Sequence, residues 1–145
     1  MRAAARCSAL LALLVLTIDP ITAHAAPTPT SKVLESKTGL ASYYSRRFDG
    51  KKTAGGDTFR NDEMVAAHRS YPLGTLVRVT NLENEESVQL LITDRGASKK
   101  NHREGVIIDV SQAAATRLKM KKDGRVRVRL DVLEWGEDTK KPLNP

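Results

Sequence analysis

The sequence has little cysteine and few aromatic residues. Among 145 residues there is one cysteine, Cys7, and aromatic residues make up 4%. A single cysteine excludes a disulfide framework within the chain and a zinc site built from cysteines. With so few aromatic rings, the core has to be built from Val, Leu, Ile and Ala. The length allows one domain, and 40% hydrophobic and 28% charged residues are typical of a globular protein.

The motifs of several enzyme classes are also missing. The chain has no serine-centred nucleophile elbow, no glycine-rich phosphate loop and no thiol in a catalytic setting. His68 and His102 stand in separate predicted loops, without the repeated spacing of metal ligands. We therefore expect no metal and no cofactor.

The N-terminal segment has the three zones of a secretory signal peptide. Arg2 and Arg6 supply positive charge, residues 10–16 form an apolar run, and Ala23–Ala25 places small residues at the spacing of a cleavage site. The alternative, a membrane-spanning anchor, needs about 20 apolar residues, and this run is far shorter. We predict that residues 1–25 are removed on export, which makes the protein periplasmic or secreted.

Cys7 precedes the apolar run, whereas the lipidated cysteine of a bacterial lipoprotein follows it. We therefore expect Cys7 to be lost with the signal peptide and the mature chain to carry no stable membrane anchor. Residues 26–38 are rich in Pro, Thr and Ser, which predicts a flexible linker. Residues 39–134 are predicted to form the folded domain and residues 135–145 a polar tail.

The formal charge of +7 arises from 24 Lys and Arg against 17 Asp and Glu. In a cytoplasmic protein this excess would suggest nucleic acid as a partner. An exported protein meets the cell wall and the membrane surface instead, and the basic residues are scattered along this chain. We therefore expect no nucleic-acid binding and interpret most of the charge as the solvated surface of a monomer.

Short strands dominate the predicted secondary structure. Apolar and polar residues alternate over 75–80 and 125–132, and a period of two is typical of strands. Ser111 can cap a helix over 112–119, which an alanine run favours. Further strands are predicted over 40–45, 87–93 and 106–110, and residues 64–68 fit a strand or a helical turn. Closing about six strands into a barrel would remove exposed edges, although periodicity alone does not separate a barrel from an open sandwich.

Three polar residues in predicted loops are candidates for chemistry. Asp94 follows the apolar strand 87–93, so its carboxyl group would lie at the rim of the core, where burial can keep a carboxyl protonated as a general acid. Asp94 could equally open a turn ahead of Gly96. His68 could polarise a substrate or be structural, and Asp57 could be a solvated loop acid.

Asp109 is a different case, because it stands inside the apolar strand 106–110. A carboxylate in that setting has to be hydrogen-bonded. We interpret it as a structural anchor for the junction between loop and helix.

Six short motifs follow one another between residues 39 and 133. They are Gly39–Tyr44, Lys52–Gly56, Ala66–Arg69, Pro72–Leu82, Asp94–Gly96 and Ile108–Ala114. In this order and spacing they resemble the rare-lipoprotein-A (RlpA-like) family, whose members are double-psi β-barrels acting on peptidoglycan. The resemblance implies a mainly β fold, namely a small six-stranded double-psi β-barrel with one short helix.

The activity implied by the resemblance is lytic transglycosylation of peptidoglycan glycan strands. One carboxylic acid protonates the glycosidic oxygen between N-acetylmuramic acid and N-acetylglucosamine, and the C6 hydroxyl of the muramic sugar then closes a 1,6-anhydro ring. The resemblance maps the catalytic acid/base onto Asp94, with His68 in the same cleft. It maps substrate contacts onto Asp57, Tyr44 and Arg95.

Several positions depart from the family pattern. Asp57 stands where the family usually has Glu, Arg60 replaces an Asp or Asn, and Val106 replaces an Arg. Ala97 and Ser98 replace a proline and an aromatic residue. These departures favour a second interpretation, a non-catalytic carbohydrate-binding or wall-loosening barrel similar to expansin and barwin-like proteins.

Asp94 and His68 are retained, which favours the enzyme over the binding protein. The sequence therefore predicts a peptidoglycan lytic transglycosylase, with the non-catalytic barrel as its alternative.

Overall fold

A computed structural model describes residues 32–96 and 98–137 of the chain. The predicted signal peptide with Cys7, residues 26–31 of the predicted linker, Ala97 and residues 138–145 lie outside the described residues. No helix in the described part has the length and apolar character needed to cross a membrane.

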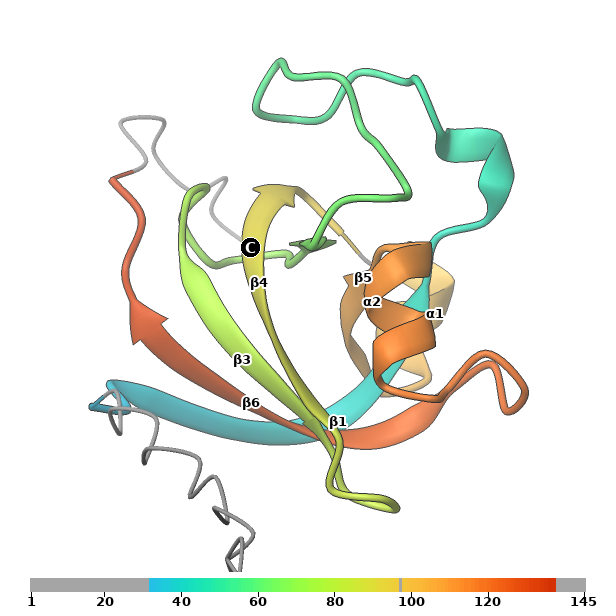
Figure 1. Cartoon of the computed structure of the whole chain (residues 1–145). Helices are drawn as coiled ribbons and strands as arrows, with labels where there is room; N and C mark the ends of the chain where they lie inside the picture. The colour runs from blue at the N-terminus through green and yellow to red at the C-terminus, as the bar shows by residue number, and fades with distance from the viewer. Residues whose placement is uncertain (1–31, 97, 138–145) are drawn as a thin grey trace, which may run out of the picture. The chain divides into compact units, whose positions relative to one another are not determined.

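Six strands close into a barrel in the order β1-β5-β2-β4-β3-β6 (Figure 1). Strands β1 and β5 pair in parallel, as do β2 and β4, and the other neighbours pair antiparallel. The bounds are β1 Glu35–Tyr43, β2 Val65–Ala67, β3 Leu76–Asn81, β4 Ser87–Asp94, β5 Val106–Val110 and β6 Val126–Glu134. The predicted six-stranded, mainly β barrel is confirmed.

The interior of the barrel is aliphatic, as the scarcity of aromatic residues predicts. In β6 every second residue from Val126 to Val132 is buried, which follows from the alternation seen in the sequence. Strand β5 is buried along nearly its whole length. The largest fully buried side chains are Leu90, Ile92, Ile108, Leu118, Met120 and Leu130.

Strand β1 begins at Glu35, earlier than the predicted strand, which starts at residue 40. Residues 35–41 pair antiparallel with β6, and Ser36 Oγ donates a hydrogen bond of 2.7 Å to Asp131 Oδ1. The polar composition of this segment does not predict a strand, because the segment is held by its pairing with β6 and not by burial of hydrophobic side chains.

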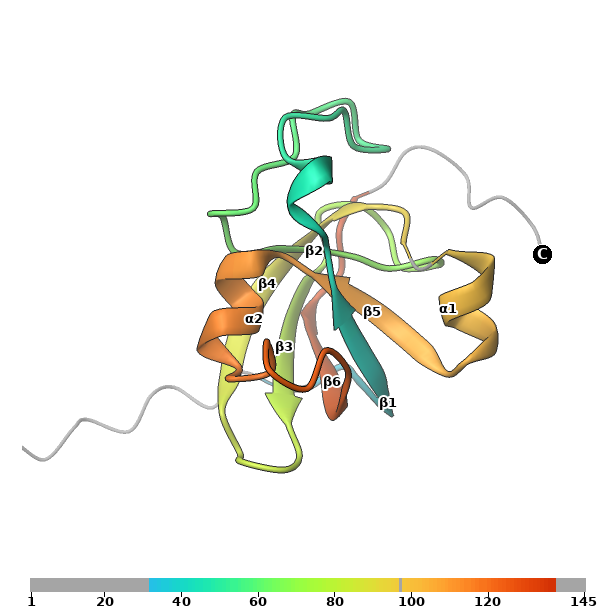
Figure 2. The same cartoon turned by 90° about the vertical axis from the view of Figure 1, so that its right-hand side faces the viewer.

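Two short α-helices flank β5, where one helix was expected (Figure 2). Helix α2 spans Gln112–Arg117 and is capped by Ser111, as predicted. Helix α1 spans Lys99–Arg103, a basic segment that we had interpreted as a loop. Its N-cap is Ser98, whose Oγ accepts a hydrogen bond of 3.2 Å from the Asn101 N–H. The segment is basic and has no hydrophobic periodicity, so the cap is its main signal for a helix.

The long connection between β1 and β2 carries a 3-10 turn over Arg46–Phe48 and an isolated bridge between Lys52 and Thr58. It extends beyond one end of the barrel (Figure 1). The end of β4 lies close to it, because the Ala54 N–H donates to the carboxylate of Asp94.

Candidate active site

Four neighbouring strands bring polar residues to one level of the barrel. Ser42 on β1 is paired with Asp109 on β5, Asp109 with Ala67 on β2, and Ala67 with Asp94 on β4. The pairing of β2 with β4 shifts by one residue just before Ala67, so Asp94 rather than Thr93 stands opposite Ala67. A register shift of this kind re-aims the side chain at the end of a strand.

A hollow of about 670 Å³ opens at this level. Asp94 and Asp109 both line it, together with the cations Arg47, Lys51, Lys52 and Arg95. Its other lining residues are Ser42, Tyr43, Tyr44, Ser45, Phe48, Gly96, Ser98 and Asn101. The hollow therefore holds two carboxyl groups surrounded by positive charge.

The Asp94 carboxylate accepts three hydrogen bonds. Oδ1 accepts from the N–H groups of Ala54 and Arg95, both at 2.8 Å, and Oδ2 accepts from the Tyr44 hydroxyl at 3.0 Å. An ionised carboxylate only accepts hydrogen bonds, so this set of donors suits a carboxylate that carries no proton. The donors also fix the orientation of Asp94 in the hollow.

Asp109 is buried, with 9% of its surface exposed. Burial raises the pKa of its carboxyl group, and a hydrogen bond from the Ser42 hydroxyl together with the charge of Arg125 opposes this in part. The hydrogen bond expected for Asp109 is the one from Ser42 on β1, and at the junction between loop and helix the Ser111 Oγ donates to the Glu63 carbonyl at 2.6 Å. Asp109 is a residue of the hollow that the sequence analysis did not place there, although a lone carboxyl in an apolar strand is the signal for it.

Tyr44 is packed between two other aromatic rings. Its ring centroid lies 5.4 Å from that of Phe48 and 4.4 Å from that of Phe59. Burial and the negative charge of Asp94 raise the pKa of the Tyr44 hydroxyl, so it stays a donor. Tyr44 therefore holds Asp94, beyond the substrate contact predicted for it.

His68 does not share the hollow with Asp94, although its backbone N–H donates to the Asp94 carbonyl at 3.1 Å. Its side chain stacks on Tyr71, with ring centroids 3.7 Å apart, and lines a separate hollow with Lys37 and His102. Nδ1 accepts from the Tyr71 N–H at 3.0 Å. Burial, together with the charge of Lys37, lowers the pKa of His68 to about 4, so the imidazole is neutral at pH 7.

The two other predicted substrate contacts differ in position. Arg95 lines the hollow, and its Nη1 donates to the Tyr71 carbonyl. Asp57 is exposed in the loop after Gly56 and does not line the hollow, and its backbone carbonyl accepts from the Thr53 N–H at 2.8 Å. The structure thus brings Asp94, Tyr44 and Arg95 together and leaves His68 and Asp57 apart.

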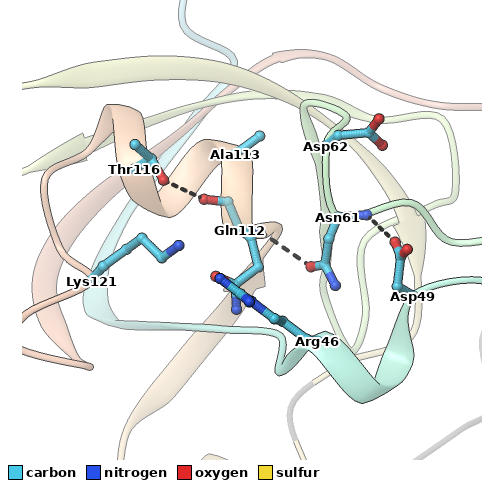
Figure 3. A pocket seen from close by; sticks show the side chains of 8 residues that line it. All are labelled: Arg46, Asp49, Asn61, Asp62, Gln112, Ala113, Thr116 and Lys121. Atoms are coloured by element: carbon cyan, nitrogen blue, oxygen red, sulfur yellow. Dashed lines mark hydrogen bonds between the residues drawn. The ribbon is translucent and has the colours of Figure 1, made fainter.

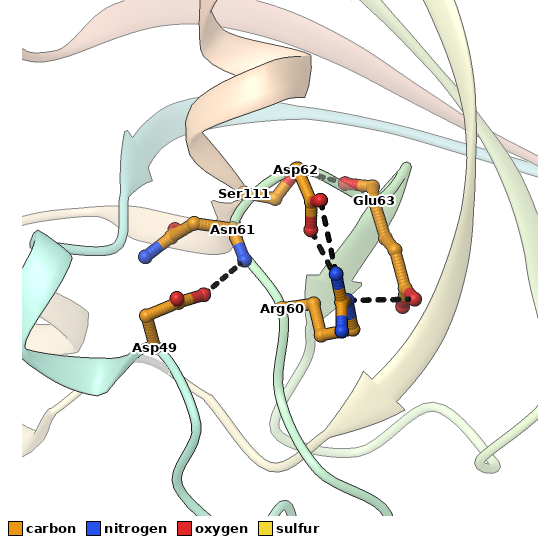
Figure 4. Close-up of polar contacts among 6 residues, drawn as sticks. All are labelled: Asp49, Arg60, Asn61, Asp62, Glu63 and Ser111. Atoms are coloured by element: carbon orange, nitrogen blue, oxygen red, sulfur yellow. Dashed lines mark hydrogen bonds and ion pairs between the residues drawn. The ribbon is translucent and has the colours of Figure 1, made fainter.

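The departing position Arg60 lies outside the hollow. Its guanidinium pairs with Asp62 at 3.2 Å and Glu63 at 3.5 Å (Figure 4). Val106 is fully buried and pairs with Leu40 of β1. Arg60 therefore lies on the surface and Val106 in the core, and neither lines the hollow that contains Asp94.

A second hollow of about 470 Å³ lies between the 3-10 turn and α2 (Figure 3). It is lined by Arg46, Asp49, Asn61, Asp62, Gln112, Ala113, Thr116 and Lys121. Its central polar groups are already paired with one another, since the Gln112 N–H donates to Asn61 Oδ1 and the Asn61 N–H to Asp49 Oδ1. This hollow lies between the loop and α2, and neither Asp94 nor Asp109 lines it.

The described residues, 32–96 and 98–137, contain no cluster of three His, Cys, Asp or Glu side chains that could hold a metal ion. The carboxyl groups and cations that line the first hollow can take part in proton transfer and electrostatic stabilisation.

The chain matches a protein family described as lytic transglycolase over residues 36–130. It is 48% identical over 101 residues to the endolytic peptidoglycan transglycosylase RlpA of Rickettsia typhi, a match covering 68% of this chain and 30% of that protein. It is 40% identical over 111 residues to the RlpA of Neisseria meningitidis serogroup B, covering 76% of this chain and 45% of that protein. The chain thus spans less than half the length of these relatives.

Two solved structures share the fold. The Streptomyces papain inhibitor superposes with a TM-score of 0.56 at 20% identity, covering 70% of this chain and 97% of that one. The expansin of Clavibacter michiganensis superposes with a TM-score of 0.50 at 19% identity, covering 77% and 54%. At such identity the likeness concerns the barrel alone.

Proposed function

The chain belongs to the lytic transglycolase family, as its resemblance to RlpA-like proteins predicted, and we propose that it is an endolytic peptidoglycan transglycosylase. Its substrate is the glycan strand, cut between N-acetylmuramic acid and N-acetylglucosamine with formation of a 1,6-anhydro ring. We further propose that it is exported through residues 1–25 and acts outside the cytoplasm as a monomer.

The observation that supports this activity is the placement of Asp94. Its carboxylate is oriented by three donors inside a hollow that has room for a sugar and is surrounded by cations. Closing the anhydro ring requires a base that takes the proton of the C6 hydroxyl as that oxygen attacks C1. Asp94, held as a hydrogen-bond acceptor, fits the base half of the acid/base role expected from the sequence.

The other predicted residues take supporting roles in this proposal. Tyr44 and Arg95 line the hollow beside Asp94 and contact the sugar. His68 fixes the end of β4 through its backbone hydrogen bond to Asp94 and acts on the reaction through that position. Asp57 contacts the substrate only when the glycan strand extends over the loop that carries this residue.

One observation favours the non-catalytic alternative. The His68 side chain faces a different hollow from Asp94, so the pair expected to act together is divided. A barrel with a single oriented carboxylate could bind glycan without cutting it.

Mass spectrometry of soluble products decides between the two functions. The purified protein and its Asp94→Asn variant are incubated with intact peptidoglycan and with peptide-free glycan. Anhydro-muropeptides or anhydro-glycans from the native protein alone support the transglycosylase. Reducing ends without the anhydro mass would indicate hydrolysis, and sedimentation with glycan but no products would support the binding barrel.

A further inference from the structure

We propose that Asp109 is the proton donor of the reaction and that Asp94 is its base, so that two carboxyl groups divide the acid and base roles. This inference rests on the proposed transglycosylase activity. It departs from the assignment of both roles to Asp94.

The pairing of the strands puts the two carboxyl groups in one row. Asp94 and Asp109 both pair with Ala67, one from each side of β2. Neighbouring strands lie about 4.8 Å apart, so the two Cα atoms are about 10 Å apart. Residues directly opposite each other point to the same face of a sheet, and both side chains line the same hollow. A sugar in the hollow can therefore contact both.

The hydrogen bonds of the two groups differ in a way that separates their roles. Asp94 accepts three hydrogen bonds, two of them from backbone N–H groups. Within the described ranges, the side-chain hydrogen bond of Asp109 is the one that Oδ1 accepts from Ser42. Burial of Asp109 favours its neutral form, which leaves Oδ2 to carry a proton.

The charged and titratable groups around Asp109 include partners of both signs. They are Arg125, Tyr44 and Asp94, with the four cations of the hollow. The positive charges favour ionisation of Asp109, whereas Asp94 and the burial of the group oppose it. Two negative charges in one hollow repel each other, so the state with one ionised and one neutral carboxyl group is favoured over the state with both ionised.

The step balances without any further reactant. Asp109 transfers its proton to the glycosidic oxygen as the bond from C1 to that oxygen breaks, and N-acetylglucosamine leaves with a free hydroxyl. The C6 oxygen of the muramic sugar bonds to C1, and its proton passes to Asp94. Water in the open hollow then returns one proton from Asp94 to Asp109, which restores the starting state.

The Asp109→Asn variant separates a proton donor from a structural residue. Asparagine keeps an Oδ1 that accepts the Ser42 hydrogen bond but has no acidic proton. We expect anhydro product formation to fall at least about 100-fold, with the midpoint of thermal unfolding close to that of the native protein. A native rate of product formation in Asp109→Asn would overturn the proposal.

The matched variant is Ser42→Ala, which removes the hydrogen bond and keeps the acid. The Ser42 bond lowers the pKa of Asp109, so its loss should move the alkaline limb of the pH profile to higher pH. An alkaline limb that does not move would overturn the proposal, and this readout decides even when Asp109→Asn does not fold.

Failure of the inference and failure of the proposed function give different results. When the native protein forms no anhydro products, the proposed transglycosylase activity itself is wrong, and the role of Asp109 in it falls with that activity. When the native protein and Asp109→Asn form them equally, the activity stands and the role of Asp109 is wrong.

Discussion

The Tyr44 hydroxyl donates a hydrogen bond of 3.0 Å to the Asp94 carboxylate, across 50 positions of sequence. Packing against Phe48 and Phe59 leaves the Tyr44 ring little freedom to turn away. A hydroxyl held in this way does not need to reorient when the charge on Asp94 changes during a reaction, which is the property expected of a preorganised site.

Replacing Tyr44 by Phe removes this donor and keeps the ring. Hydrogen bonds to charged groups contribute about 1.5–3 kcal/mol, and 1.4 kcal/mol corresponds to about tenfold in rate. We expect Tyr44→Phe to lower kcat on peptide-free glycan by about tenfold or more, measured by release of anhydro products.

The control for this variant is Tyr43→Phe. Tyr43 lines the same hollow, but its hydroxyl donates to the Lys121 carbonyl at 3.1 Å and does not contact Asp94. We expect its kcat to stay within about twofold of the native value. Equal losses in the two variants would show that the Tyr44 hydroxyl has no special part in the reaction.

Gly96 allows the end of β4 to approach β2 closely. A Cβ at this position would lie 2.4 Å from the Ala67 Cβ and 2.9 Å from the Ala67 carbonyl carbon. We expect Gly96→Ala to cost about 1–3 kcal/mol in the free energy of unfolding, because overpacking next to the backbone forces the strands apart. It should also reduce activity by displacing Asp94, and denaturant titration with the product assay measures both effects.

Gly55→Ala provides the comparison for stability. The nearest atom to a Cβ at Gly55 is the Thr93 carbonyl oxygen at 3.3 Å, so a small shift relieves the contact. We expect a cost well below that of Gly96→Ala. A native free energy of unfolding in Gly96→Ala would mean that β2 and β4 are not held at this separation.

Local patterns were sufficient to predict strands β3 to β6, the capped helix α2 and the position of Asp94 at the end of β4. They could not predict which residues stand opposite one another. The row from Ser42 to Asp94 depends on a register shift before Ala67, and closure of the whole barrel sets that register. The resemblance to the family placed His68 in the cleft of Asp94, whereas the His68 side chain stacks on Tyr71 and lines another hollow.

His68 makes stability depend on pH. Its pKa is lowered from 6.5 to about 4 in the folded protein, so the unfolded chain binds a proton first as the pH falls. The stabilisation is fully present above pH 6.5 and is lost between about pH 6.5 and 4, by up to about 3 kcal/mol. Chemical denaturation of the native protein over this range measures the loss.

The His68→Asn variant removes the titration and keeps an acceptor for the Tyr71 N–H. We expect its stability to fall less steeply than the native one between pH 6.5 and 4. Parallel curves for native protein and His68→Asn would contradict the assignment of the acid-sensitive group.

Asp131 lies on β6 and links this strand to its two neighbours in the barrel, β1 and β3. Its carboxylate is 2% exposed and accepts from Ser36 at 2.7 Å, from Arg78 at 2.9 Å and from Arg129 at 3.3 Å. Burial alone would raise the pKa of Asp131, but these hydrogen bonds outweigh it and hold the pKa below its usual value. The stabilisation is therefore present above pH 3.8 and is lost as the pH falls through the lowered pKa.

Removing Arg78 from this cluster tests its contribution to stability. We expect Arg78→Met to lower the free energy of unfolding at pH 7 by about 3 kcal/mol, because the buried Asp131 keeps its charge and loses its main cation. The deficit should shrink at acid pH, because Asp131 then becomes protonated in the folded variant and no longer carries an unpaired buried charge. Arg127→Met, at an exposed position of β6, should change stability by less than about 0.5 kcal/mol. Neither arginine lines the hollow with Asp94, so both variants should keep the native rate of product formation at a temperature where they are folded. A deficit in Arg78→Met that is the same at pH 3 and pH 7 would show that lost packing of the arginine stem, and not the charge on Asp131, causes it.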